Sequence, residues 1–508
     1  MNDPCSVQER LIAALMRRFE REGRAATLVE THISWVVVLD ELTYKFKKAR
    51  RLEFLDYASP QARRYYCEEE IRLNRRYAEP LYLGVSTLTG PANAPCLDGD
   101  GPVLDYAVRL RTFPQTALWT RRLADGLLGS GDAARLAAAL ARFHASATTC
   151  PAGASWGSAT QVAKRTAADL RELRVLSDGA AARQVLDRLD NWHSHAARRL
   201  SRLLDWRRAH GAIRECHGDL HCGNILTLGD AVLPFDGIEF NDSMRWIDTM
   251  QDLAFAWMDL QFHGRADLAA RLLNDYLQLG GDYYGLAVLP YYRVQRALVR
   301  AKVAALRGDR ALGDAYLRFA AGCTVPTRGV LLATHGLSGS GKSTVCDRLV
   351  EPLCAVQVRS DMERKRLPGV PVGALYCAET TELTYARLAR VARRALGAGL
   401  PVLVDAAFLQ GRQRQAFRRL AHARAVPFLL LDVQADPGLL AGRLRERAIA
   451  GRDPSDADEA VLAQQRATAQ ALAQDELPDS LPVTADAALS TSVRAALAER
   501  GYTPERAP

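Results

Sequence analysis

Apolar residues follow a helical period in some stretches of the chain and form short continuous runs in others. Near the N-terminus, Leu11, Ile12, Leu15, Met16 and Phe19 recur every three to four residues. This spacing predicts an amphipathic first helix. In the C-terminal third, apolar runs at 330–333, 356–358, 402–404, 428–433 and 482–484 alternate with helical stretches, notably 379–396. This alternation predicts β-α-β units, and therefore a parallel sheet with helices on both faces.

Two apolar runs in the middle of the chain predict a hairpin. Residues 225–228 and 231–235 flank Gly229-Asp230, a suitable two-residue turn. In antiparallel pairing about this turn, residue 224 lies opposite residue 235. Asn224 and Asp236 are therefore expected together at the open end, where two oxygen ligands would suit Mg²⁺.

The stretch before this hairpin, residues 217–224, reads His-Gly-Asp-Leu-His-Cys-Gly-Asn. An Asp followed five residues later by an Asn is the spacing of a protein-kinase-type catalytic loop. In such a loop the Asp orients or deprotonates the acceptor hydroxyl, and the Asn holds Mg²⁺. A zinc site is an alternative for this stretch, with Cys216, His217, His221 and Cys222 as ligands. Their spacing is too cramped for the usual paired-ligand loops.

Residues 336–344 read Gly-Leu-Ser-Gly-Ser-Gly-Lys-Ser-Thr, a complete phosphate-binding loop. Its glycines allow backbone N–H groups to face phosphate oxygens, Lys342 reaches the terminal phosphates, and the Ser343 hydroxyl can ligate Mg²⁺. A flexible Gly/Ser linker fits badly because the flanks are apolar and periodic. We expect ATP and Mg²⁺ as ligands, with contacts from Gly336, Ser338, Gly339, Ser340, Gly341, Lys342, Ser343 and Thr344.

Acidic residues follow two of the predicted strands in this region. Asp405 ends one strand and can share Mg²⁺ with Ser343, although a helix cap is the alternative. Asp361 follows another and begins an Asp-x-x-Arg element with Arg364. This element resembles that of small-molecule and polynucleotide P-loop kinases, in which the Asp meets the acceptor hydroxyl.

A basic stretch further on resembles the mobile lid of the same kinases, which carries arginines onto the transferring phosphate. Arg443, Arg447 and Arg452 are spaced by four and five residues, so they can share a helix face and its end. The alternative for each is an exposed basic helix. The longer sequence signatures of motor proteins are not found after this stretch. We therefore interpret the C-terminal third as a kinase.

The segment 217–259 resembles the aminoglycoside phosphotransferase and choline kinase-like family. The shared residues are His-Gly-Asp at 217–219, Asn224, and an Asp-x-x-Glu made by Asp236 and Glu239. Nearly end to end, the chain resembles bacterial two-part proteins that join such a domain to a C-terminal P-loop kinase domain. The resemblance implies an α+β two-lobed protein-kinase-like domain followed by an α/β P-loop domain with a parallel sheet.

Carried onto this sequence, the resemblance implies roles for four residues of the segment. Asp219 would be the catalytic base, Asn224 and Asp236 would be Mg²⁺ ligands, and Glu239 would be a weaker metal candidate. Three further residues complete the family pattern, and we interpret them as structural because an Asp near a helix start is commonly a cap. They are His144, Asp248 and Asp252.

The N-terminal lobe would supply the lysine that grips the α- and β-phosphates. Lys45 is the first choice, and Lys47 points to the same face of a period-two strand. Glu69 or Glu70, on the following helix, would pair with that lysine, and we assign Glu69 to the nucleotide site. The lobe departs from the protein-kinase pattern because residues 31–34 stand where a Gly-x-Gly-x-x-Gly loop is expected.

Composition sets the frame for these sites. A chain of 508 residues suggests about three compact units, and we divide it into an N-lobe (1–110), a C-lobe (111–322) and a P-loop domain (326–508). The net charge of +9 favours anionic ligands, but the basic runs are more typical of solvated faces than of nucleic-acid grooves. Ten dispersed cysteines, with neither a membrane-length apolar run nor a signal-peptide profile, indicate a cytoplasmic protein.

We therefore predict an ATP-dependent phosphotransferase with two nucleotide sites and an unidentified hydroxyl acceptor. Two alternatives stay open. One domain, more readily the N-terminal one, could be a nucleotide-binding regulatory module. The C-terminal domain could instead be a polynucleotide-type kinase, which would make nucleic acid a partner.

Overall fold

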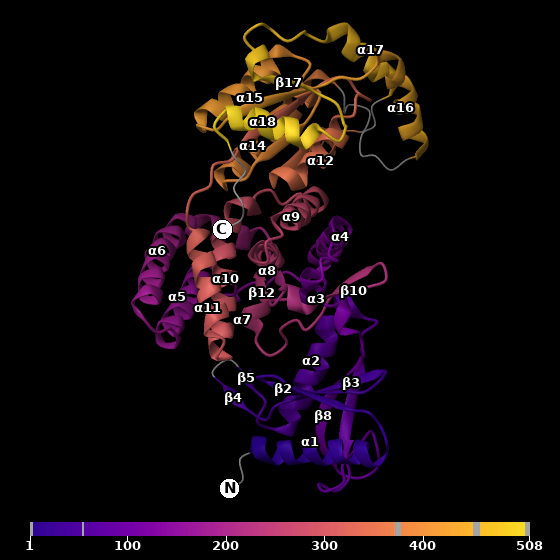
Figure 1. Cartoon of the computed structure of the whole chain (residues 1–508), viewed down its shortest axis with the longest axis vertical. Coiled ribbons are helices and arrows are strands. Elements are labelled where there is room, and N and C mark those ends of the chain that lie inside the picture. Colours follow the sequence, from indigo (N-terminus) through magenta and orange to yellow (C-terminus); the bar gives the residue numbers. More distant parts are fainter. Residues whose placement is uncertain (1–3, 53–54, 370, 372–376, 451–457, 503–508) are drawn as a thin grey trace. The chain divides into compact units, whose positions relative to one another are not determined.

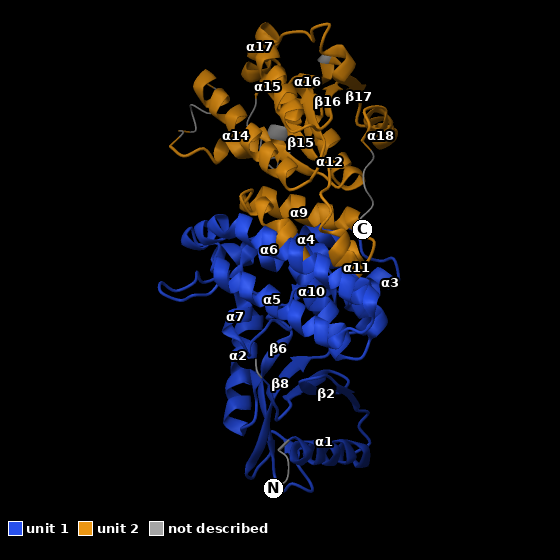
Figure 2. Ribbon diagram, turned by 90° about the vertical axis from the view of Figure 1, so that its left-hand side faces the viewer, with its two compact units in different colours: residues 1–259, 295–317 blue, residues 260–294, 318–508 orange. Residues whose placement is uncertain are grey.

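The computed structural model describes residues 4–502 apart from 53–54, 370, 372–376 and 451–457. The described residues form two compact units, coloured separately in Figure 2. Unit 1 comprises residues 1–259 and 295–317, and unit 2 comprises residues 260–294 and 318–508. The length had suggested about three units, and both predicted lobes contribute to unit 1. No helix within the described ranges has the length and apolarity needed to span a lipid bilayer.

Unit 1 begins with a six-stranded antiparallel sheet in the order β1-β2-β3-β8-β6-β7. The predicted first helix, α1 (Pro4–Arg21), buries Leu15 on one face of this sheet, beside Ala107. Helix α2 (Pro60–Ala78) joins a second cluster with Val108. Because successive strand residues point to opposite faces, the two helices cover opposite faces. The strands are β1 (Thr27–Glu30), β2 (Ser34–Val38), β3 (Leu42–Lys47), β6 (Tyr82–Thr89), β7 (Cys96–Leu97) and β8 (Val103–Arg111), with the separate pair β4 (Arg51–Leu52) and β5 (Leu55–Asp56).

The rest of unit 1 is mainly helical and carries two short antiparallel strand pairs. Strands β10 (Ile225–Leu228) and β11 (Ala231–Pro234) form the predicted hairpin, and β9 (Ile213–Glu215) pairs with β12 (Trp246–Asp248). The Phe235 N–H donates to the Asn224 carbonyl at 2.9 Å, so residue 224 does lie opposite residue 235. The helices are α3 (Trp119–Ala124), α4 (Ser130–Ser146), α5 (Ala159–Leu176), α6 (Ala180–Ala209), α7 (Asp242–Arg245), α8 (Thr249–Phe262), α10 (Leu289–Leu306) and α11 (Arg310–Gly322), the last three extending into unit 2.

Unit 2 contains the predicted parallel sheet, whose strand β17 is labelled in Figure 1. The strand order is β14-β15-β13-β16-β17. Its strands are β13 (Leu331–His335), β14 (Val356–Arg359), β15 (Val402–Asp405), β16 (Phe428–Val433) and β17 (Ser480–Val483). All five predicted runs are strands, and β17 starts two residues before its predicted run. Since parallel strands all end at one edge, the residues after β13, β14 and β15 are brought together there.

The helices of unit 2 pack around this sheet. Helices α12 and α18 share a core with Leu332, Leu403 and Leu429, while α14 and α15 contact the same sheet outside that core. The helices are α9 (Ala266–Gly280), α12 (Lys342–Leu353), α13 (Ser360–Lys365), α14 (Ala378–Gly397), α15 (Gly411–Ala423), α16 (Pro437–Ala450), α17 (Glu459–Thr468) and α18 (Leu489–Glu499).

Leu349 tests the importance of this core. Its side chain is fully buried on α12, and we expect Leu349→Ala to lower the free energy of unfolding of unit 2 by about 2–5 kcal/mol because it leaves a cavity. The control Leu477→Ala, at a 53% exposed position, should change it by less than about 0.5 kcal/mol. Urea unfolding followed by circular dichroism checks both, with tryptophan fluorescence as the reference because all seven tryptophans lie in unit 1. Equal decreases in the free energy of unfolding of the two variants would contradict the assignment of Leu349 to the core of unit 2.

Candidate active sites

The phosphate-binding loop joins β13 to α12, as its sequence predicts. Gly339 and Gly341 have φ of 85° and 98°, in the left-handed region that favours glycine. A Cβ on Gly339 would lie 2.9 Å from the Leu440 carbonyl oxygen, so a side chain there would clash with α16. The loop backbone therefore depends on its glycines for both its conformation and its packing.

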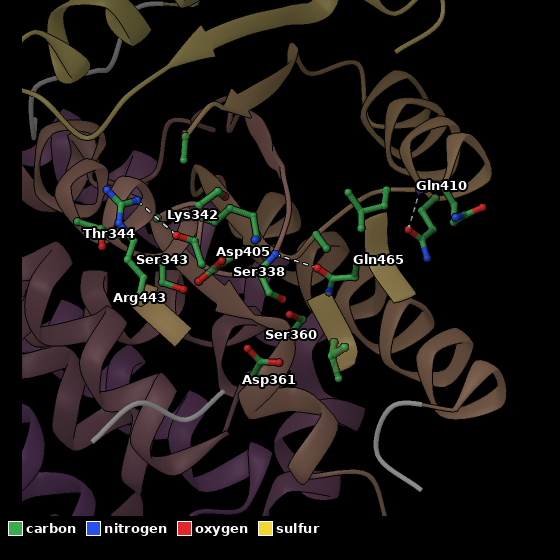
Figure 3. Close-up of a pocket in the computed structure, with 18 of the residues that line it drawn as sticks. Ser338, Lys342, Ser343, Thr344, Ser360, Asp361, Asp405, Gln410, Arg443 and Gln465 are labelled. Carbon is green, nitrogen blue, oxygen red and sulfur yellow. Dashed lines mark hydrogen bonds between the residues drawn. The ribbon is translucent and has the colours of Figure 1, made fainter. Parts of the chain in front are cut away.

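A cavity of about 990 Å³ opens over this loop, and its lining comes from segments far apart in the sequence (Figure 3). The loop supplies one wall, and the carboxyl ends of β14 and β15 supply another. Eleven of the predicted site residues line it, namely Ser338, Gly339, Ser340, Gly341, Lys342, Ser343, Thr344, Asp361, Arg364, Asp405 and Arg443. Gly336 is not part of the lining, although it belongs to the same loop.

Asp405 is the buried carboxylate of this cavity, with 4% of its surface exposed. Its Oδ2 accepts a hydrogen bond from Gln357 Nε2 at 2.9 Å and lies 3.6 Å from Arg359 Nε. The Ser343 hydroxyl also hydrogen-bonds to the carboxylate, yet burial raises the pKa of Asp405. A hydroxyl and a carboxylate held at one point provide the hard oxygen donors that Mg²⁺ prefers.

Asp361 and Arg364 lie one helical turn apart on α13, with 4.0 Å between Oδ1 and Nη1. The lid region lies over the loop: Arg443 Nη1 donates to the Gly339 carbonyl at 3.4 Å, and Gln465 of α17 accepts the Ser338 N–H at 2.8 Å. Figure 3 shows this second contact as a dashed line. Arg447 lies on α16, but its side chain is outside the described part of the chain, as is the whole of Arg452.

The second site is built on the segment before the hairpin. Asn224 Nδ2 donates to Asp219 at the carbonyl (3.0 Å) and at Oδ2 (3.1 Å), so the two residues lie together as their spacing predicted. Burial alone would raise the pKa of Asp219, but His221, 3.5 Å from Oδ2, together with Arg300 and His217, outweighs burial and lowers that pKa well below its usual value. Asp219 is thus a stable carboxylate, with 35% of its side chain exposed.

His217 links this segment to the hairpin. Its Nδ1 accepts the Asp219 N–H at 3.2 Å, which leaves Nε2–H to donate to the Phe235 carbonyl at 2.9 Å. Burial lowers the pKa of His217 and so favours this neutral form. His217 and His221, two of the residues considered for zinc, therefore serve as hydrogen-bonding groups.

Asp252 holds the same segment from the other side. Its carboxylate accepts the N–H groups of His217 (3.0 Å) and Gly218 (2.9 Å) and lies 3.2 Å from His144 Nε2. The sequence had suggested that Asp252 caps a helix; instead it orients the backbone next to Asp219. Asp248 does act as a cap, because its Oδ1 accepts the Met250 N–H at 2.8 Å.

A buried network of lysines and glutamates completes this site. Lys45 on β3 donates to Glu70 at 3.0 Å and to Asp236, and Lys47 donates to Glu70 at 2.7 Å and to Glu239. Burial opposes the charged form of Glu70, but the two ammonium groups lower its pKa to about 2. Likewise, burial opposes the charge of Lys45, but Asp236 and Glu70 raise its pKa well above its usual value.

One predicted pairing needs correction. Glu69 does not pair with the strand lysine: it pairs with Arg72 at 2.9 Å and lies 4.0 Å from Arg245, and Glu70 takes its place beside Lys45. Glu239 is buried, and its Oε1 accepts hydrogen bonds from Lys47 and Tyr57; its role as a metal ligand stays a prediction. The buried stripe of α2, which includes Cys67, Glu70 and Asn74, is a helical pattern that favours Glu70 over Glu69.

The expected phosphate-covering hairpin is the β1–β2 turn. It is closed by the Thr31 N–H, which donates to the Ser34 carbonyl at 2.9 Å, and Lys48 Nζ donates to the Thr31 carbonyl at 2.6 Å. The turn therefore uses its own polar groups internally, where a glycine-rich loop would present open N–H groups.

Comparisons with known proteins match two separate segments of the chain. Residues 109–289 match the model of the phosphotransferase enzyme family, and residues 331–472 match that of an AAA domain. Uncharacterized proteins of Mycobacterium tuberculosis and Mycobacterium bovis are 29% identical over 428 residues, which cover 80% of this chain and 84% of each relative.

Two solved structures are among those similar to this chain. A choline/ethanolamine kinase family protein from Mesorhizobium loti is 15% identical with a TM-score of 0.36, covering 59% of this chain and 87% of that one. A gluconokinase from Sinorhizobium meliloti is 22% identical with a TM-score of 0.24, covering 34% of this chain and 92% of that one.

The family matches define the class of protein: a phosphotransferase-type kinase domain followed by a P-loop kinase-like domain. The predicted fold class, a kinase-like fold and then an α/β domain with a parallel sheet, is confirmed. The protein is an ATP-dependent kinase, as the sequence predicted.

Glu70 makes the stability of unit 1 depend on pH. Because its pKa is depressed to about 2 from an ordinary value of 4.5, its contribution is complete above pH 4.5 and is lost as the pH falls toward 2. Glu70→Gln should lower the free energy of unfolding at pH 7 by about 3–5 kcal/mol and reduce its dependence on pH below 4.5. Tryptophan fluorescence during urea unfolding measures both effects. The exposed neighbour Glu68→Gln is the control, and an equal acid loss in Glu70→Gln and the unmutated protein would contradict this account.

Proposed function

We propose that the chain carries two phosphoryl-transfer centres, each moving the γ-phosphate of ATP to a hydroxyl group of an acceptor. The observation that carries this proposal is the cavity over the phosphate-binding loop. It gathers a lysine and a hydroxyl from α12, a buried carboxylate from β15, and a second carboxylate with its arginine from α13. Phosphoryl transfer needs these groups because its catalysis depends mainly on positioning and charge neutralisation.

In the P-loop centre, we assign Lys342 and the loop N–H groups to the phosphates of ATP. Ser343 and Asp405 would hold Mg²⁺, which neutralises phosphate charge when bound. Asp361, with Arg364 beside it, would orient the acceptor hydroxyl from α13. Arg443, already over the loop, would meet the transferring phosphate from the lid, and Arg447 is assigned there from the sequence alone.

In the N-terminal centre, we assign Asp219 as the base that orients or deprotonates the acceptor hydroxyl. Its depressed pKa keeps it ionised, and its partly open side chain can reach an acceptor. Asn224 and Asp236 would hold Mg²⁺, and Lys45 would grip the phosphates while Glu70 holds it in place. Asp236 pairs with Lys45 in this structure, so nucleotide binding would redistribute these charges.

We place the N-terminal centre in residues 1–322 and the residues that line the P-loop cavity in 326–508. A regulatory role for the N-terminal centre is the alternative, and the closed β1–β2 turn favours it because that turn offers no glycine-rich cover for phosphates. Lys342→Ala and Asp219→Asn together distinguish a second catalytic centre from a nucleotide-binding module.

Lys342→Ala tests the P-loop centre. We expect it to lower ADP release from that centre by about 10²–10³-fold, because it removes a cation that stabilises developing phosphate charge. ADP release from ATP, measured with a panel of hydroxyl compounds, is the readout. Lys164→Ala, at an exposed position in unit 1, is the control and should leave turnover unchanged. Full turnover in Lys342→Ala would exclude catalysis at the loop.

Asp219→Asn tests the N-terminal centre. Loss of the base should lower phosphoryl transfer there by about 10²–10⁴-fold while nucleotide binding is retained. The assay is ADP release in a Lys342→Ala background, so that only this centre contributes. Asp230→Asn, in the exposed hairpin turn, is the matched control. If the Lys342→Ala protein binds ATP but releases no ADP even with Asp219 intact, the N-terminal centre is a binding module.

A further inference from the structure

Helix α9 belongs to unit 2, although its sequence lies inside the phosphotransferase match at 109–289. It is coloured with the P-loop elements in Figure 2. The AAA match begins only at residue 331, so neither family model includes α9 in the P-loop part of the chain. The contacts of α9 show what it contributes to the P-loop site.

Helix α9 covers the edge of the parallel sheet. Strand β14 is an edge strand, and the backbone N–H of Gln357 points away from its neighbour β15. Asn274 of α9 accepts that N–H through Oδ1 at 2.8 Å, and both residues are buried. The contact satisfies a polar group that an uncovered edge would leave to water.

The Gln357 side chain carries this contact to the active site. Its Oε1 accepts a hydrogen bond from Gln278 Nε2 of α9 at 3.2 Å, and its Nε2 donates to Asp405 Oδ2 at 2.9 Å. Because the amide is only 2% exposed and bonded at both ends, its orientation is fixed by α9. One oxygen of Asp405, Oδ2, is thereby held by the Gln357 amide.

Charged contacts hold α9 in place on both sides of Gln357. Arg271 pairs with Asp347 at 2.6 Å and with Glu351 at 2.8 Å, both on α12 directly after the phosphate-binding loop. Arg366, following α13, donates to the Gln278 carbonyl and pairs with the buried Glu363 at 2.5 Å. Helix α9 therefore contacts the elements that carry Ser343 and Asp361, as well as the strand beside Asp405.

We infer that Gln357 is a positioning residue for the Mg²⁺ ligand Asp405, and that α9 sets its orientation through Gln278 and Asn274. The functional P-loop kinase thus includes a helix from the phosphotransferase-matching segment. This inference rests on the proposed role of Asp405 as a metal ligand. Partners that orient a metal-ligating carboxylate are commonly worth 10- to 100-fold in metal affinity.

The test measures Mg²⁺ affinity in the full chain. A fluorescent ATP analogue is bound first in EDTA and then during titration with Mg²⁺, and the part of the signal lost in Lys342→Ala reports the P-loop site. Gln357→Met keeps the side-chain length but removes the amide. It should leave the affinity for the ATP analogue in EDTA unchanged. It should raise the Mg²⁺ concentration that gives half of the fluorescence change by about 10-fold or more. An unchanged Mg²⁺ affinity would overturn the inference.

Gln278→Ala tests the contribution of α9 itself. If Gln357→Met impairs folding, Gln278→Ala becomes the variant that tests the inference. It should raise the half-effect Mg²⁺ concentration by about two- to tenfold, the range of one net hydrogen bond. The exposed Gln415→Ala on α15 is the matched control and should change nothing. If Asp405→Asn leaves Mg²⁺ affinity intact, the metal role of Asp405 is wrong. If Asp405→Asn weakens it but Gln278→Ala does not, only the role of α9 is wrong.

Discussion

The buried ion network of Lys45, Lys47, Glu70 and Glu239 is the interaction on which unit 1 depends. It joins strand β3, helix α2 and the segment after the hairpin, three elements that are distant in the sequence. An unpaired charge at these depths would cost several kcal/mol, so each member requires the others. The network therefore fixes where Lys45 meets Asp236, which is the point at which the proposed phosphate and metal groups come together.

In unit 2 the site residues are also distant in the sequence, but the geometry of a parallel sheet brings them together. Parallel strands end at one edge of the sheet, so the sheet itself brings together the residues that follow them. Asp405 ends β15, Asp361 follows β14, and the phosphate-binding loop follows β13. The carboxylate at the centre of this edge is oriented by an amide, Gln357, where unit 1 uses lysines.

This contrast explains how much of each site could be predicted from the sequence. The position of Asp405 followed from a strand end, and the position of Asn224 opposite residue 235 followed from a two-residue turn, because both depend on local chain geometry. The choice of Glu69 over Glu70 was wrong because neighbouring helix residues differ by about 100° in direction, and only the buried stripe distinguishes them. Gln357 carries no motif, and its role depends on a contact with α9 that no sequence pattern indicates.

The two sites also differ in how they hold negative charge before a nucleotide binds. In unit 1 the carboxylate of Asp236 is paired with Lys45, so an arriving metal would compete with an existing ion pair. In unit 2 burial raises the pKa of Asp405, since an amide and an arginine 3.6 Å away compensate its charge only in part. A cation at the proposed Mg²⁺ position would supply the missing compensation there. At the N-terminal site a metal would instead have to replace an ammonium group that already pairs with Asp236.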